Sequence, residues 1–291
     1  MKISVVVQGG GMAGVYSMAA LDALANSELA KDVEYIVGSS AGAINASYFV
    51  SKRTKEAVDF YINYLSNKNF INLHRFNKIV DIDFMVDTLK LENPLNIELL
   101  RTSNIKLDVA LTEEKTANPE LFTYDGSVDI YELIRATAAL PFFYNRFVSI
   151  EGELYCDGGI ASPLPLNNEL IEHSDLVIVI LTCDINDRKK KMGRFLKNVF
   201  KVFLSKYSDN VVEKLVGENV EYNATMDFLQ YKISNSNVFV CFPSNLKDRA
   251  SIVTSNKEKL EKCSALGHID MQNVIKEIKK YLLYIQSKER C

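Results

Sequence analysis

The chain has 291 residues, of which 47% are hydrophobic and 24% charged, so its composition excludes a disordered chain or a collagen-like fibre. Its net charge of −3 argues against nucleic-acid binding by the chain as a whole. Apolar runs such as Leu176–Leu181 are too short to span a membrane, and Ile3–Val7 is too short for a signal-peptide core, so we expect a cytoplasmic protein.

The first 50 residues contain two strand–turn–helix units. The first is a strand at Ile3–Gln8, a glycine-rich turn at 9–14 and a helix from Val15 to about Leu29; the second is a strand at Glu34–Val37, a sharp turn at Gly38–Gly42 and a helix from Ala43. This pattern predicts an α/β fold in which a mainly parallel sheet lies between helical layers.

Further strands and helices are predicted downstream. Residues 54–100 should be mainly helical; strands are expected at Ile105–Leu111, Leu121–Tyr124, Leu154–Cys156, Leu176–Thr182 and Val238–Phe242, and helices at Ile130–Ala139, 188–231 and Ile269–Gln286. The composition shifts near residue 183 from glycine-rich to Lys/Asn-rich. We therefore expect a core at 1–182 and a mostly helical extension at 183–291 packed on it.

A serine between two glycines is the first candidate for chemistry. Gly38-Ser39-Ser40-Ala41-Gly42 follows an apolar strand and precedes a helix, as expected of a nucleophile elbow with Ser40 exposed at the turn. The alternative is an ordinary strand-to-helix turn in which a serine only caps the helix.

The glycine cluster after the first strand allows two interpretations. Gly9, Gly11 and Gly14 match the dinucleotide-binding pattern, but that site needs an acidic residue at the end of the second strand, where Gly38 and Ser39 stand. We favour an oxyanion hole built from the bare backbone N–H groups of Gly9, Gly10 and Gly11.

Asp157 in Asp157-Gly158-Gly159 is a candidate base for the serine, although Asp-Gly is also a common hairpin turn. His173 and His268 are the histidines that follow it, and both are expected at the surface, as is His74. This favours a Ser–Asp pair over a Ser–His–Asp triad.

The cysteines are five in number and include no Cys-x-x-Cys pair. We therefore expect no zinc site and no disulfide framework, but reduced thiols at Cys156, Cys183, Cys241, Cys263 and Cys291.

Together these motifs resemble the patatin-like phospholipase family. Arg135 to Phe143 resembles the small-residue helix of that family, which ends in proline, and Asp157-Gly158-Gly159-Ile160 with Pro163-Leu164-Pro165 resembles its second active-site block. The match covers residues 3–182, and the rest resembles a bacterial branch with a C-terminal extension.

The resemblance implies a three-layer α/β/α fold and hydrolysis of lipid acyl esters, of phospholipase A or lysophospholipase type, without a metal or other cofactor. Ser40 would be the nucleophile and Asp157 the base, and the amides of Gly10 and Gly11, with Met12, would form the oxyanion hole. The family usually has a basic residue where this chain has Ala13, which leaves open a general carboxylesterase. The other alternative is a catalytically weak lipid-binding protein, in which residues 188–207 matter and Ser40 does not.

Residues 188–207 carry eight Lys or Arg and no Asp or Glu, and apolar residues interleave at helical spacing. A basic amphipathic helix of this kind can lie in an anionic membrane interface, so peripheral membrane contact is one interpretation. The other is a helix whose apolar face packs on the domain while its lysines are solvated.

Overall fold

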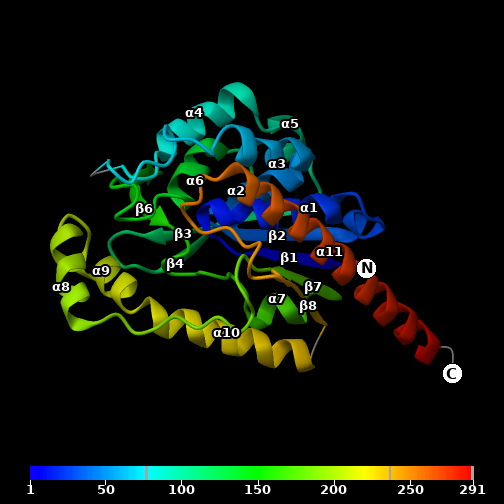
Figure 1. Cartoon of the computed structure of the whole chain (residues 1–291). Helices are drawn as coiled ribbons and strands as arrows, with labels where there is room; N and C mark the ends of the chain where they lie inside the picture. Colours follow the sequence, from blue (N-terminus) through cyan, green and yellow to red (C-terminus); the bar gives the residue numbers. More distant parts are fainter. Residues whose placement is uncertain (76–77, 236, 290–291) are drawn as a thin grey trace.

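The computed structural model describes residues 1–75, 78–235 and 237–289 (Figure 1). Two sequence-based expectations concern residues outside that range: the thiol of Cys291, and residues 76–77 of the segment 54–100 that is expected to be mainly helical. The other four cysteines are free thiols. Among the described residues, no helix combines the length and apolar character needed to cross a bilayer.

An eight-stranded mixed sheet forms the centre, in the order β5-β6-β3-β2-β1-β7-β8, with β4 paired to β3. The run β3-β2-β1-β7-β8 is parallel, as expected, whereas β4, β5 and β6 are antiparallel additions at one end. The strands are β1 (Ile3–Val7), β2 (Val33–Ser39), β3 (Lys106–Glu113), β4 (Pro119–Thr123), β5 (Val148–Ile150), β6 (Glu153–Asp157), β7 (Leu176–Ile180) and β8 (Val238–Cys241).

Helices cover both faces of this sheet, which gives the expected three-layer α/β/α architecture. In Figure 1, α1, α2 and α11 lie above the sheet, and α7 and α10 lie below it. The α-helices are α1 (Gly14–Ala25), α2 (Ala41–Val50), α3 (Thr54–Asn63), α4 (Ile82–Glu92), α5 (Ile97–Thr102), α6 (Ile130–Thr137), α7 (Asn168–Glu172), α8 (Arg194–Phe203), α9 (Asp209–Val216), α10 (Glu218–Asn235) and α11 (Lys257–Glu289). Short 3-10 helices lie at Gly11–Ala13 and Glu28–Asp32.

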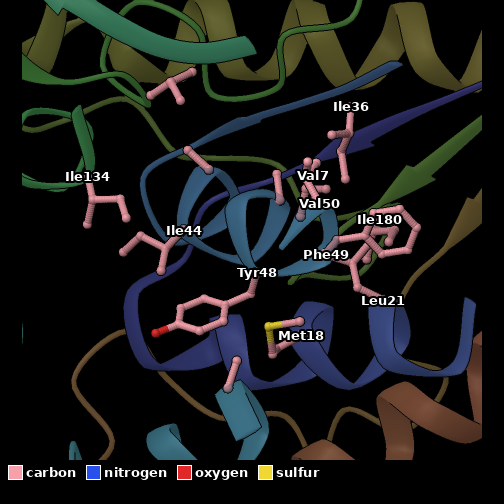
Figure 2. Close-up of a cluster of buried hydrophobic side chains, with 14 of the residues drawn as sticks. Val7, Met18, Leu21, Ile36, Ile44, Tyr48, Phe49, Val50, Ile134 and Ile180 are labelled. Carbon is pink, nitrogen blue, oxygen red and sulfur yellow. The ribbon is translucent and has the colours of Figure 1, made fainter. Parts of the chain in front are cut away.

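Alternate residues of the central strands enter different hydrophobic cores on the two faces of the sheet, because successive side chains of a strand point to opposite faces. In β1, Val5 and Val7 join the core beneath α1 and α2, whereas Val6 joins the core against α10. Figure 2 shows part of the first core, where side chains from α1, α2 and the strands meet. All five residues of β1 and of β7 are buried, as their apolar sequences predict.

The helical extension differs from expectation in its boundaries. The helix expected over 188–231 is broken into α8, α9 and the first part of α10, because Ser208 caps α9 through the Val211 amide and Gly217 ends it. Helix α11 begins at Lys257 rather than Ile269. Residues 183–291 also add a strand to the sheet, since β8 pairs in parallel with β7.

A buried polar contact fixes α11 on α1. The Tyr16 hydroxyl donates to the Asp270 carboxylate at 2.9 Å, and the Ser244 hydroxyl donates to the same carboxylate at 2.6 Å. A Cβ on Gly267 would lie 2.2 Å from the Tyr16 carbonyl oxygen, so the two helices cross at a distance that glycine permits. The hydrogen bond from Ser244 to Asp270 anchors the start of the loop that leads to Ile252, the residue whose carbonyl contacts the glycine turn at Met12.

Candidate active site

Ser40 lies at the turn between β2 and α2 in a backbone conformation that is rare for a residue with a side chain. Its φ is 51° and its ψ is −129°. Gly38 and Gly42 make the turn sterically feasible, because a Cβ on Gly38 would lie 2.4 Å from the Gly42 carbonyl carbon, and one on Gly42 would lie 2.2 Å from the Val7 carbonyl oxygen. The strained serine is held by close backbone packing on both sides.

Strand β3 brings Asp157 to this turn. Ser39 at the end of β2 pairs with Ala110 of β3, and Asp157 at the end of β6 pairs with Leu111, the next residue of β3. Both β2 and β6 lie on the edge of β3 that is opposite β4, so the ends of these two strands meet. The Ser40 hydroxyl donates to Asp157 Oδ2 at 2.8 Å, and the Gly159 amide donates to Oδ1 at 2.7 Å.

Burial changes the acidity of this carboxyl group. Asp157 is 3% exposed, and loss of hydration raises its pKa to about 7. Hydrogen bonds from Ser40 and Gly159 oppose the rise, as does the charge of Lys189, whereas the charge of Glu218 adds to it. A carboxyl group with a pKa near 7 can both accept and return a proton at neutral pH.

Thr137 holds the backbone of the turn, a role that sequence reasoning missed. The Ser40 N–H donates to Thr137 Oγ1 at 2.8 Å, and the same hydroxyl donates to the Ala110 carbonyl at 2.7 Å. Thr137 ends α6 and is fully buried. The small-residue run before Pro141 was a signal of this segment, but it does not specify which residue contacts the serine.

The glycine turn lies against Ser40, since a Cβ on Gly9 would be 2.9 Å from the Ser40 Cβ. Among the hydrogen bonds of the described residues, none is donated by the amides of Gly9, Gly10 or Gly11. Met12 differs from the expectation, because its amide donates to the Ile252 carbonyl at 2.9 Å and its side chain is buried. Within the described part of the chain, the three glycine amides are therefore without an acceptor, whereas the Met12 amide has one.

Two cavities meet at Ser40 and Asp157. The larger, about 630 Å³, is lined by residues of the glycine turn and by residues downstream of 182, besides Ser40 and Asp157. Those downstream residues include Asp187, Arg188, Lys189, Glu218, Arg249 and Ile252. The smaller, about 60 Å³, has mainly apolar walls from α2, α3 and α4. Leu140, Phe143 and Ile252 border both cavities.

The basic side chains on the wall of the larger cavity are paired with acids. Arg249 Nη1 lies 2.5 Å from the Asp187 carboxylate, and Lys189 pairs with Glu218. Because these partners all lie downstream of residue 182, the extension supplies the salt-bridged part of the cavity wall.

The histidines lie away from Ser40. His173 contacts the Glu169 carbonyl at the end of α7, and His268 contacts Gln272 on α11. Within the described part of the chain, the lining of neither cavity includes a histidine, and no cluster of three His, Cys, Asp or Glu side chains has the arrangement of a metal site.

Comparisons with known proteins show which family this chain resembles. The family model "Patatin-like phospholipase" matches residues 5–169, and a domain of unknown function, DUF6363, matches residues 208–283. The uncharacterized protein YjjU of Escherichia coli (strain K12) is 28% identical over 189 residues, which are 62% of this chain and 52% of that protein. Human patatin-like phospholipase domain-containing protein 4 is 26% identical over 164 residues, which are 54% of this chain and 64% of that protein.

The chain thus spans between half and two thirds of the length of these curated relatives. Among solved structures, that of VipD from Legionella pneumophila matches with a TM-score of 0.56 and 14% identity, over 95% of this chain and 67% of that one, a similarity of fold. Because the family model covers more than half of the residues, this chain belongs to the patatin-like phospholipase family.

Proposed function

We propose that this protein is a serine hydrolase of lipid acyl esters, with Ser40 as nucleophile and Asp157 as base. One observation carries the proposal: the Ser40 hydroxyl donates a 2.8 Å hydrogen bond to a buried carboxylate, and both residues line a cavity of about 630 Å³. Membership of the patatin-like phospholipase family supports lipid acyl hydrolysis in general. Phospholipase A or lysophospholipase activity is the specific form that we propose.

The reaction follows from the geometry as two acyl transfers. Ser40 Oγ attacks the ester carbonyl carbon while its proton passes to Asp157 Oδ2, and the amides of Gly10 and Gly11 stabilise the oxyanion. Collapse of the tetrahedral intermediate breaks the ester bond, and Asp157 returns the proton to the departing alcohol. Water then attacks the carbonyl carbon of the acyl-Ser40 ester and passes a proton to Asp157. Collapse of this second tetrahedral intermediate breaks the bond to Ser40 Oγ, Asp157 returns the proton to Oγ, and the fatty acid leaves.

A second candidate is a general carboxylesterase, favoured by two features of the cavity. Ala13 replaces the basic residue that is usual in the family loop and is itself buried. The cationic side chains that remain on the wall, such as Arg249 and Lys189, are paired with acids. A substrate phosphate would have to compete with those carboxylates.

Hydrolysis should be measured with a medium-chain p-nitrophenyl ester and with phospholipid vesicles. We expect Ser40→Ala and Asp157→Asn each to reduce kcat/KM by about 10³-fold or more, because each removes one half of the proton-transfer pair. Ser39→Ala is the matched control; its hydroxyl faces the Pro163 carbonyl at 3.3 Å and should be dispensable. Ester turnover without phospholipid turnover would favour the carboxylesterase, and equal rates in wild type and both variants would reject the hydrolase.

The pH dependence should report the buried base. Asp157 must be ionised to accept a proton, and its pKa is raised to about 7. We therefore expect kcat/KM for a soluble ester to rise roughly tenfold per pH unit up to about pH 7 and then to level off. A profile that is flat between about pH 5 and 9, after subtraction of spontaneous hydrolysis, would exclude this carboxyl group as the base.

Thr137→Val should impair the turn without changing the shape of the side chain. It leaves the Ser40 N–H without its 2.8 Å acceptor and the buried Ala110 carbonyl without its 2.7 Å donor, so we expect kcat/KM to fall about tenfold and the protein to lose about 1–3 kcal/mol of stability. Thr137→Ser retains the hydroxyl and should restore both kcat/KM and the urea-unfolding midpoint. Full activity in Thr137→Val would show that this hydrogen bond does not position Ser40.

A further inference from the structure

Helix α8 presents apolar side chains to solvent instead of burying them. None of its residues is buried, and Phe195 and Val202 are 82% and 74% exposed. Because successive residues turn by about 100°, Phe195, Val199 and Val202 lie on one side of the helix and Arg194, Lys197 and Lys201 on the opposite side. The apolar stripe is therefore only partly covered, which differs from the interpretation that it packs on the domain.

The covered edge of the stripe connects α8 to the candidate active site. Phe200 stacks on Phe142, with ring centroids 5.4 Å apart, and Phe142 contacts Phe143 edge to face at 5.5 Å. Phe143 lines both cavities beside Ser40. Phe142 has a φ of 77° and is itself partly exposed, so the loop holds an aromatic ring outward in a conformation that non-glycine residues rarely adopt.

The charge around α8 is strongly positive. From residue 188 to residue 208 the chain has no acidic residue. Of the bases in this segment, Arg188, Lys189 and Lys201 pair with Asp227, Glu218 and Glu213, which lie on α9 and α10. Lys190, Lys191 and Arg194 are exposed and form no ion pair with any residue that the structure describes.

We propose that α8, together with Phe142, docks this protein on an anionic lipid surface. The exposed apolar side would enter the boundary between head groups and acyl chains, and the lysines and arginines would contact lipid phosphates. A second copy of the chain fits this surface poorly, because a symmetric contact would bring two strongly basic segments together. Figure 1 shows α8 at the edge of the molecule, at the opposite side from the end of α11.

Docking at α8 needs neither Ser40 nor turnover, so it can be tested apart from the proposed function. If the hydrolase assignment holds as well, the Phe200–Phe142–Phe143 contacts place the cavity next to the docked surface.

Co-sedimentation should use the full chain carrying Ser40→Ala, with vesicles of phosphatidylcholine alone or mixed with phosphatidylglycerol. We expect binding to the anionic vesicles that weakens with salt, and an affinity about tenfold lower in each of two variants: Phe195→Ser with Val202→Ser, and Lys190→Gln with Lys191→Gln and Arg194→Gln. The matched control is Leu91→Ser with Leu283→Ser, which removes leucines that are 79% and 67% exposed on α4 and α11. It should bind like the parent.

The proposal would be overturned if the protein did not bind anionic vesicles, or if the apolar and the basic variants both bound as well as the parent. Self-association in sedimentation velocity that Phe195→Ser with Val202→Ser abolishes would also overturn it. The same pair of substitutions in the Ser40 protein should leave kcat/KM on a soluble ester unchanged and lower turnover on anionic vesicles. Vesicle binding without turnover on either substrate would reject the proposed function and leave the docking surface intact.

Discussion

The register of strand β3 determines where the candidate active site lies. Ala110 of β3 pairs with the last residue of β2, and Leu111 pairs with the last residue of β6, on the same edge. Two chain segments 117 residues apart therefore end side by side, and the Ser40 hydroxyl reaches the Asp157 carboxylate. A shift of one residue in either pairing would turn the side chains to the other face of the sheet and separate the pair.

The part of the chain downstream of residue 182 completes this site. Helix α11 is fixed on α1 by the contact of Tyr16 with Asp270, and the preceding loop brings the Ile252 carbonyl to the Met12 amide. The same region supplies the salt-bridged wall of the larger cavity. The lining of the larger cavity includes residues from both sides of residue 183. The division of the chain into a core and an extension at that residue therefore remains a proposal.

Local signals predicted the elements that carry Ser40 and Asp157. Gly38 and Gly42 are required by backbone approaches that no other residue allows, so the turn is visible in the sequence. Contacts between distant segments left no such signal in the sequence. The Thr137 hydroxyl accepts a hydrogen bond from the Ser40 N–H, 97 residues away, and the Ile252 carbonyl accepts one from the Met12 N–H. The start of α11 was predictable in principle, because Asn256 caps it through the Lys259 amide. The exposure of α8 was not, because an amphipathic pattern has the same spacing on a core and on a surface.

The central claim, that Asp157 activates Ser40, is tested most directly by covalent labelling with a fluorophosphonate. The wild-type protein should gain a single adduct that maps to Ser40 within the tryptic peptide spanning residues 32–52, and Ser40→Ala should gain none there. Above the pKa of about 7, Asp157→Asn should label at least about 100-fold more slowly, because the hydroxyl has lost its proton acceptor. An adduct on another residue, or equal labelling rates in wild type and Asp157→Asn, would contradict the account.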